Sequence, residues 1–231
     1  MVLTIIINMK NNKYRYNDSL KELQKIGLDN VIIFNAIDGN LDLNNYEYTA
    51  MENFINPCTN AQLRVGEIGC SLSHYFVWKF ICENQISEAL ILEDDNVFLS
   101  DFNKELNLIL NSNLNYDLFF FNRNKVNKNI NETIVNNKYV KMSYSYNANA
   151  YLIKNKAAFV LYSSNFIDNI MPVDEFLPIM YDKMYPHKFL KNKINPSQYL
   201  DSYSLLRHVC KQRNGSSQAN HSEFYNSYAN V

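Results

Sequence analysis

The chain has 231 residues, of which 47% are hydrophobic and 14% aromatic, and its formal net charge is −1. This length fits one domain, and the apolar content excludes a chain that is disordered throughout. Because basic and acidic residues nearly balance, the composition argues against a nucleic-acid partner or an anionic membrane surface. The apolar run at residues 2–7 is too short for a membrane span and lacks the basic flank of a signal peptide, which favours a cytoplasmic location.

Apolar runs and helical spacings alternate along most of the chain. In chain order, they predict a strand at 2–8, a helix over 20–28 that closes with Gly27, a strand at 31–35, a long helix over 66–82, a strand at 89–92, a helix over 102–110, strands at 118–121 and 148–153, and a helix over 154–162. The polar, asparagine-rich stretch 125–138 indicates a surface loop. Strands that alternate with helices predict an α/β fold around a mostly parallel sheet.

The predicted strand at 89–92 runs directly into three acids, Glu93, Asp94 and Asp95. Carboxylates repel one another, so this arrangement favours a bound cation. On an extended backbone, Glu93 and Asp95 point the same way and Asp94 the opposite way. Oxygen ligands of this kind suit Mn²⁺ or Mg²⁺ that carries the phosphates of a nucleotide. The triplet therefore predicts a metal site with Glu93 and Asp95 as ligands; the alternative is a strand end with exposed acids, one of which caps the next helix.

Further motifs lie around the acids in a recognisable order. They are residues 5–9 (IIINM), 36–39 (AIDG), 66–75 (GEIGCSLSHY) and 171–177 (MPVDEFL), the last followed by Pro178 and by Tyr181-Asp182-Lys183. Together they resemble glycosyltransferase family 25, which includes bacterial lipooligosaccharide galactosyltransferases and animal procollagen galactosyltransferases. The block that begins at Pro172 looks closest to the collagen-modifying branch. The resemblance extends from the first strand to about Lys183.

The resemblance implies the GT-A fold, a Rossmann-like, mostly parallel sheet flanked by helices. Residues 1–185 would form the nucleotide-sugar-binding and catalytic core. Residues 186–231, where the pattern weakens, would form an irregular segment of the same domain that closes the site. The implied activity is a metal-dependent, inverting transfer of galactose from UDP-galactose to a hydroxyl acceptor, either hydroxylysine of collagen-like protein or a glycan. A UDP-glucose donor and a non-catalytic binding domain of the same fold stay open as alternatives.

Donor binding is expected where the strands end, because ligands of open α/β sheets occupy the crevice beyond the carboxyl ends. Arg15 offers a guanidinium that matches phosphate or uracil oxygens, or else is a solvated residue at a helix start. Asp38 can accept hydrogen bonds from uracil or ribose, or open the turn before Gly39. His74 borders the donor sugar by resemblance, or is a satisfied core residue. The residues expected to bind the UDP-sugar are Asn8, Arg15, Ala36, Asp38, Ser73, His74 and Asp94.

Asp174 is the expected catalytic base. An inverting transfer needs a carboxylate opposite the departing UDP, where it takes the proton of the acceptor hydroxyl. The resemblance favours Asp174, its neighbour Glu175 is the second candidate, and the alternative role for Asp174 is a helix N-cap after Pro172. A third metal ligand is expected from the C-terminal part, where His221 is preferred over His208.

Overall fold

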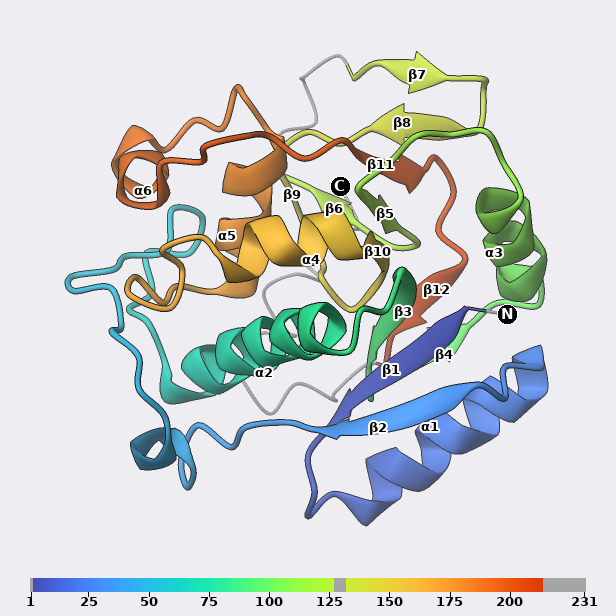
Figure 1. Cartoon of the computed structure of the whole chain (residues 1–231), viewed down its shortest axis with the longest axis horizontal. Coiled ribbons are helices and arrows are strands. Elements are labelled where there is room, and N and C mark those ends of the chain that lie inside the picture. Colours follow the sequence, from blue (N-terminus) through green and yellow to red (C-terminus); the bar gives the residue numbers. More distant parts are fainter. Residues whose placement is uncertain (1, 127–131, 214–231) are drawn as a thin grey trace.

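A mixed eight-stranded sheet forms the centre of the computed structural model, which describes residues 2–126 and 132–213 (Figure 1). The strand order is β2 (Val31–Asn35), β1 (Leu3–Asn8), β3 (Glu88–Glu93), β10 (Ala150–Lys154), β5 (Leu118–Phe120), β11 (Ser202–Leu205), β8 (Tyr139–Lys141) and β7 (Ile134–Val135). The pairings make β10 and β8 run against the other six strands. The predicted α/β class with a mostly parallel sheet is therefore confirmed.

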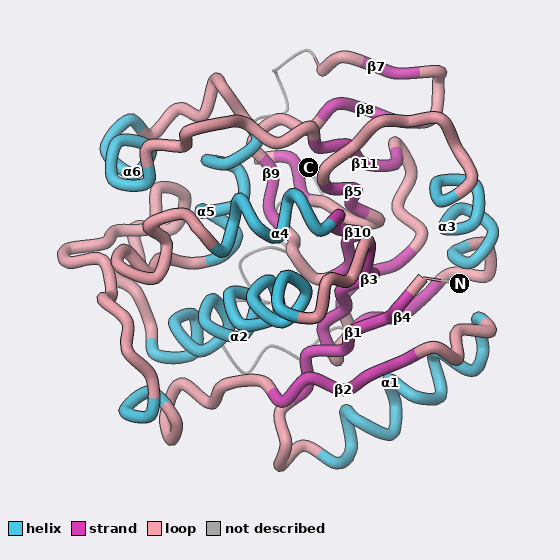
Figure 2. The backbone as a smooth tube through the Cα atoms, viewed as in Figure 1, coloured by secondary structure: helices cyan, strands magenta, loops and turns pink. Residues whose placement is uncertain are grey.

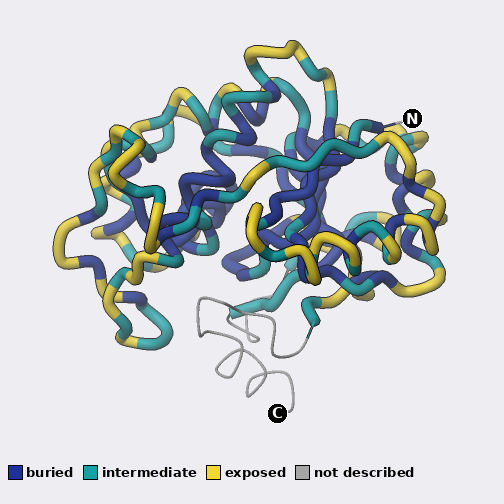
Figure 3. The backbone as a smooth tube through the Cα atoms, turned by 90° about the horizontal axis from the view of Figure 1, so that it is seen from below, coloured by how far each residue is buried: buried dark blue, intermediate teal, exposed yellow. Residues whose placement is uncertain are grey.

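Helices cover both faces of this sheet, as Figure 2 shows with strands in magenta between helices in cyan. One face carries α2 (Val65–Glu83), α4 (Asn155–Tyr162) and α5 (Val173–Tyr181), and the other carries α1 (Lys13–Ile26) and α3 (Phe102–Leu110). Strand β3 supplies both cores, because Ala89 and Ile91 pack on the first face and Leu90 and Leu92 on the second. A strand buried on both sides reads as a continuous apolar run, which is why it was visible in the sequence. Figure 3 shows the buried segments in dark blue within the molecule.

The sequence encodes both ends of helix α1. Helix α1 begins at Lys13, seven residues before the apolar spacing starts, because its first turns are mostly exposed and polar. The Asn12 side chain caps it by accepting a hydrogen bond from the Arg15 N–H at 3.1 Å. Gly27 ends it with φ of 69°, a left-handed conformation that glycine adopts without strain.

The C-terminal part is more regular than the irregular segment that we expected for residues 186–231. Its described residues form α6 (Lys188–Ile194), the central strand β11, and β12 (Cys210–Gln212), which pairs with β4 (Asn96–Phe98). The pattern hid β11 because its sequence, SYSL, alternates serine with larger residues and offers no apolar run. The division of the chain at residue 185 stays a prediction.

The remaining elements are short. They are the 3₁₀ helix Leu43–Asn45, β6 (Asn124–Lys125) and β9 (Ser145–Tyr146), the last two paired with each other. The expected loop 125–138 thus contains the end of β6 and the edge strand β7, and its residues 127–131 lie outside the described part. Within the described ranges, the helices lack the combination of length and apolar character that a membrane crossing needs.

Candidate active site

A cleft opens at the carboxyl ends of β1, β2 and β3, which is where the predicted site residues were expected to meet. Its walls are completed by the start of α2, the residues before β10, the start of α5 and the end of β12. The lining residues are Ile7, Met9, Arg15, 36–40, Gly66, Glu67, Cys70, Ser73, 93–95, 147–149, 172–174 and Gln212. Arg15, Ala36, Asp38, Ser73, the three acids and Asp174 are therefore brought together, whereas Asn8, His74 and Glu175 do not line the cleft.

The loop after β2 is fixed by a close approach to α2. A Cβ on Gly39 would lie 1.9 Å from the Val65 carbonyl oxygen, and a Cβ on Gly69 would lie 2.5 Å from that of Ile37. Ser73 accepts the Ile37 N–H at 2.8 Å and donates its own proton to the Gly69 carbonyl at 2.7 Å. Ser73 thus anchors the loop that contains Ala36 and Asp38.

Asp38 has the turn role that the sequence offered as its alternative. Its Oδ1 accepts the Asn40 N–H at 2.8 Å, which is an Asx turn. The same residue also lines the cleft, so the turn holds a carboxylate at its rim. Binding of the uracil or ribose of the nucleotide by Asp38 stays a prediction.

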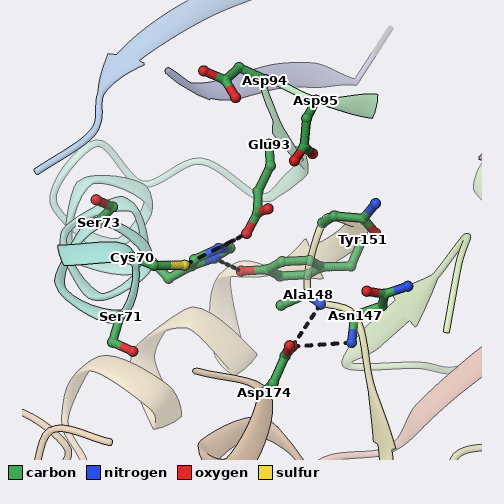
Figure 4. A network of polar contacts seen from close by, with 12 residues as sticks. Cys70, Ser71, Ser73, Glu93, Asp94, Asp95, Asn147, Ala148, Tyr151 and Asp174 are labelled. Carbon is green, nitrogen blue, oxygen red and sulfur yellow. Dashed lines mark hydrogen bonds and ion pairs between the residues drawn. The ribbon is translucent and has the colours of Figure 1, made fainter. Parts of the chain in front are cut away.

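The three acids diverge as the strand alternation predicted (Figure 4): Glu93 and Asp95 extend to one side, and Asp94 points away. Asp94 accepts the Asn8 side-chain amide at 2.7 Å and pairs with Arg15 at 2.9 Å. Ser19 donates to the Asp94 carbonyl at 2.8 Å. Burial raises the pKa of Asp94, and Arg15 and Asn8 oppose that rise. Asn8 and Arg15 thus hold the acid triplet in place, and Arg15 still contributes to the cleft wall.

His74 contacts an acid of the triplet from a fully buried position. Its Nε2 lies 3.2 Å from Glu93 Oε1, and its Nδ1 lies 2.9 Å from the Tyr151 hydroxyl, which also accepts the Trp78 N–H at 3.0 Å. Cys70, one turn earlier on α2, donates to the same Glu93 oxygen at 3.7 Å. The ligand atoms of Cys70, His74 and Glu93 lie within 4.8 Å of one another, so this trio is a possible metal-binding group.

Asp174 reaches into the cleft from the first turn of α5, on the side facing the acids (Figure 4). Its Oδ1 accepts the backbone N–H groups of Asn147 at 3.1 Å and Ala148 at 3.0 Å. Pro172 occupies the N-cap position, so Asp174 fastens the strand start to the helix instead of capping α5. Burial, followed by the charge of Glu93, raises the pKa of Asp174 to about 6.

Glu175 points away from the cleft into a cluster of tyrosines. The fully buried carboxyl accepts hydrogen bonds from Tyr144 at 2.8 Å, from Tyr185 at 2.5 Å and from Tyr146. Burial raises its pKa to about 7, although the three hydroxyl groups lower it. A carboxyl engaged in this way has no access to an acceptor hydroxyl, so the geometry disfavours Glu175 as the base.

Glu175→Gln is expected to flatten the pH dependence of stability. The folded pKa of about 7 exceeds the ordinary 4.5, so the folded state binds the proton more tightly. The contribution of Glu175 to the free energy of unfolding therefore falls as pH rises from 4.5 to 7 and is constant above that. Glutamine does not titrate and therefore lacks this loss. The stability of the variant relative to that of the wild type should be higher at about pH 8 than at about pH 5. Urea unfolding at both pH values measures this, and parallel wild-type and variant curves would contradict it.

Several lining residues were not predicted. Gln212 donates to Asp95 Oδ2 at 3.2 Å, and the Arg213 N–H donates to the Asp95 carbonyl at 2.8 Å. Gln212 gave no signal because it lies more than a hundred residues from its partner Asp95. It also belongs to the C-terminal part of the chain, where the alternation of apolar runs and helical spacings weakens. Asn149 is one asparagine among many, although its place just before a strand is the signal that could have marked it. His221 lies outside the described residues, and His208 is not among the residues that line the cleft.

A Rossmann-like sheet with an acid-lined cleft at its strand ends is the arrangement of a glycosyltransferase fold. A family model described as "Glycosyltransferase family 25 (LPS biosynthesis protein)" matches residues 1–177. The chain belongs to glycosyltransferase family 25.

Similar curated proteins include two whose names refer to procollagen. "Procollagen galactosyltransferase 2" of Homo sapiens is 33% identical over 77% of this chain and 30% of its own length. A "Glycosyltransferase 25 family member" of Drosophila melanogaster is 33% identical over 79% and 31%. "Procollagen lysyl hydroxylase and glycosyltransferase" of Acanthamoeba polyphaga mimivirus is 32% identical over 77% and 21%. The chain thus spans about a third or less of the length of these relatives.

Proposed function

We propose that this chain is a metal-dependent, inverting galactosyltransferase of the GT-A type. It moves galactose from UDP-galactose to a hydroxyl group, with hydroxylysine of a collagen-like protein as the acceptor. The observation that carries the proposal is the pairing of Glu93 and Asp95 on one side of the cleft with Asp174 on the facing side. A displacement with inversion needs this separation, because the leaving group and the attacking oxygen occupy opposite faces of the sugar.

The carboxylate oxygens in the cleft are suitable ligands for a divalent cation. Glu93 and Asp95 offer carboxylate oxygens to the same cleft, and the charge of Glu93 contributes to the raised pKa of Asp174. Carboxylates gathered on one wall of the cleft repel one another, and Mn²⁺ or Mg²⁺ would neutralise their charge. Glu93 and Asp95 would hold the ion, with His221 as the predicted third ligand. When bound, the ion supplies positive charge to the UDP leaving group.

Asp174 is suited to receive the acceptor proton. With a pKa of about 6, it is mainly ionised at neutral pH and still basic enough to compete for a hydroxyl proton. Two backbone N–H groups hold Oδ1, and none of the described residues forms a hydrogen bond with Oδ2. The anchored oxygen fixes the carboxylate, and Oδ2 remains for the acceptor.

The collagen-type acceptor rests on the names of the relatives, two of which refer to procollagen. A glycan acceptor is the alternative that the family description, with its reference to LPS biosynthesis, favours. Glucose and galactose differ only in the configuration at one hydroxyl group. We therefore assign galactose as the donor sugar from the name of a relative, procollagen galactosyltransferase.

A non-catalytic domain of the same fold is the second candidate function. The family resemblance leads us to expect arginines just after the first strand, and Asn11 and Asn12 at those positions favour this candidate. A donor screen separates the two candidates by measuring UDP release across UDP-sugars with Mn²⁺, with and without a hydroxylysine peptide. We expect UDP-galactose to give the highest release and the peptide to increase it. UDP binding without release from any donor would favour the non-catalytic domain.

A further inference from the structure

Asn149 is a buried polar residue of the cleft to which nothing above assigns a role. It stands directly before β10, has 1% of its surface exposed, and lines the cleft beside the acids. The orientation of its side-chain amide follows from its neighbours, which matters because the oxygen and nitrogen of an amide offer opposite hydrogen-bonding chemistry.

The neighbouring Asn96 determines that orientation. Its Nδ2 lies 3.0 Å from the Glu93 carbonyl oxygen and 2.6 Å from the Asn149 carbonyl oxygen, and both are acceptors. Only the amide nitrogen can donate to two carbonyls, so the Oδ1 of Asn96 must face the other way. There it accepts a hydrogen bond from Asn149 Nδ2 at 3.1 Å.

The consequence is a buried acceptor, without a partner in the described part of the chain, on a residue of the cleft wall. Because Asn149 Nδ2 is committed to Asn96, its Oδ1 is the polar atom that remains, and it has no hydrogen-bond partner among the described residues. Turning the amide over would place nitrogen against nothing that accepts and oxygen against oxygen. A buried carbonyl without a donor is costly, which is the expected state of an atom that a ligand satisfies.

The backbone around Asn149 bridges the two halves of the cleft. The N–H groups of Asn147 and Ala148 hold Asp174, and the carbonyl of Asn149 accepts the Glu93 N–H at 2.8 Å. Three consecutive residues thus run from the proposed base to the proposed metal ligand. In the proposed transfer, the hexose lies between the acceptor oxygen at Asp174 and the diphosphate at Glu93 and Asp95.

We propose that Asn149 Oδ1 accepts a hydrogen bond from a hydroxyl group of the donor hexose and thereby selects the sugar. The inference rests on the proposed function, because it takes its hexose position from the proposed base and metal ligands. A carbonyl oxygen accepts a hydrogen bond from a hydroxyl group and disfavours an analogue that has no hydrogen to donate. Asn149 is then a specificity-determining residue that acts on the sugar and not on the nucleotide.

The test compares UDP, UDP-galactose and the deoxyfluoro analogues of UDP-galactose by calorimetric titration with Mn²⁺. Fluorine in place of the contacted hydroxyl cannot donate, so the wild type should bind one analogue about ten-fold more weakly than UDP-galactose. Asn149→Ala should bind UDP-galactose about ten-fold more weakly than the wild type does and should no longer distinguish that analogue. Its affinity for UDP should stay near the wild-type value.

Two further variants separate recognition from folding. Asn149→Asp keeps an oxygen at the position and should preserve the preference for the hydroxyl over fluorine, although it loses the hydrogen bond to Asn96 and should lower the melting temperature. Asn155→Ala removes an amide that donates to the Ile81 and Ile86 carbonyls away from the cleft, and it should leave the ratio of UDP to UDP-galactose affinity unchanged. If Asn149→Ala is too unstable to titrate, Asn149→Ser replaces it.

The outcomes are distinct. Equal weakening of UDP and UDP-galactose by Asn149→Ala, or an unchanged fluorine penalty in that variant, overturns the role of Asn149 and leaves the proposed function standing. A wild type that binds no UDP in Mn²⁺ overturns both the proposed function and this inference. Loss of the fluorine penalty in Asn149→Ala together with its retention in Asn149→Asp supports the inference.

Discussion

Asp95→Ala is expected to abolish the Mn²⁺-dependent binding of UDP. Asp95 is buried at the cleft wall, where it would supply an oxygen to the ion. Loss of a residue that merely orients a metal ligand already costs about 10–100-fold in metal affinity, so loss of a ligand should cost more. Glu93→Ala should act in the same way. Calorimetric titration of UDP with Mn²⁺ and with EDTA measures the effect.

Asp94→Asn provides the comparison for these variants. Its carboxylate points to Asn8 and Arg15, so the substitution should weaken UDP binding less than Asp95→Ala does and should instead lower the melting temperature. The Cys70–His74–Glu93 trio does not contain Asp95, so a strong effect of Asp95→Ala argues for the acid triplet as the metal site. UDP titrations that look the same in EDTA as in Mn²⁺ would remove the ion from the proposal.

Asp174→Asn is expected to reduce turnover by about 10²-fold or more while UDP binding stays nearly intact, because the amide cannot take a proton. The Asp174 pKa of about 6 adds a pH signature. The wild-type rate should rise as pH increases through about 6, since the ionised form is the active one, and the residual rate of the variant should lack this rise. Single-turnover rates across that pH range measure both effects.

Glu88→Gln is a matched exchange of acid for amide at the opposite end of β3. Glu88 accepts the Tyr116 hydroxyl at 2.6 Å and does not line the cleft, so its amide should keep near wild-type turnover. A purely structural Asp174 would give another result: a lower melting temperature in Asp174→Ala and an unchanged rate in Asp174→Asn. The second finding would mean that another group takes the proton.

Strands and helices whose burial produces a pattern in adjacent residues were predictable from the sequence. Strand β3 is apolar on both faces, and α3 has the bounds that its spacing predicted, Phe102–Leu110. The acids at the end of β3 reached the cleft because strand ends meet at one edge of the sheet, and Asp174 comes to it from the first turn of α5. Such features depend on the local pattern and on general rules of topology.

Pairings between remote residues were not predictable. The sequence offers Asn8 and His74 as residues that bind the UDP-sugar, and it gives no sign that Asn8 donates to Asp94 or that His74 contacts Glu93. Both contacts depend on which strands and helices become neighbours, and no local pattern encodes that. The same reason hid Gln212, whose partner Asp95 belongs to a distant strand.

The position of β11 has a consequence for how the protein is made. This strand joins β5 to β8, yet it follows both of them in the chain. A nascent chain emerges from its N-terminus, so the sheet from β2 to β5 and the β7–β8 hairpin exist as two pieces until residues 202–205 leave the ribosome. Both pieces then display unpaired edges, which recruit strands from other chains. A chain truncated before Ser202 would therefore be an aggregation-prone fragment, because residues 202–205 are the strand that closes the sheet between β5 and β8.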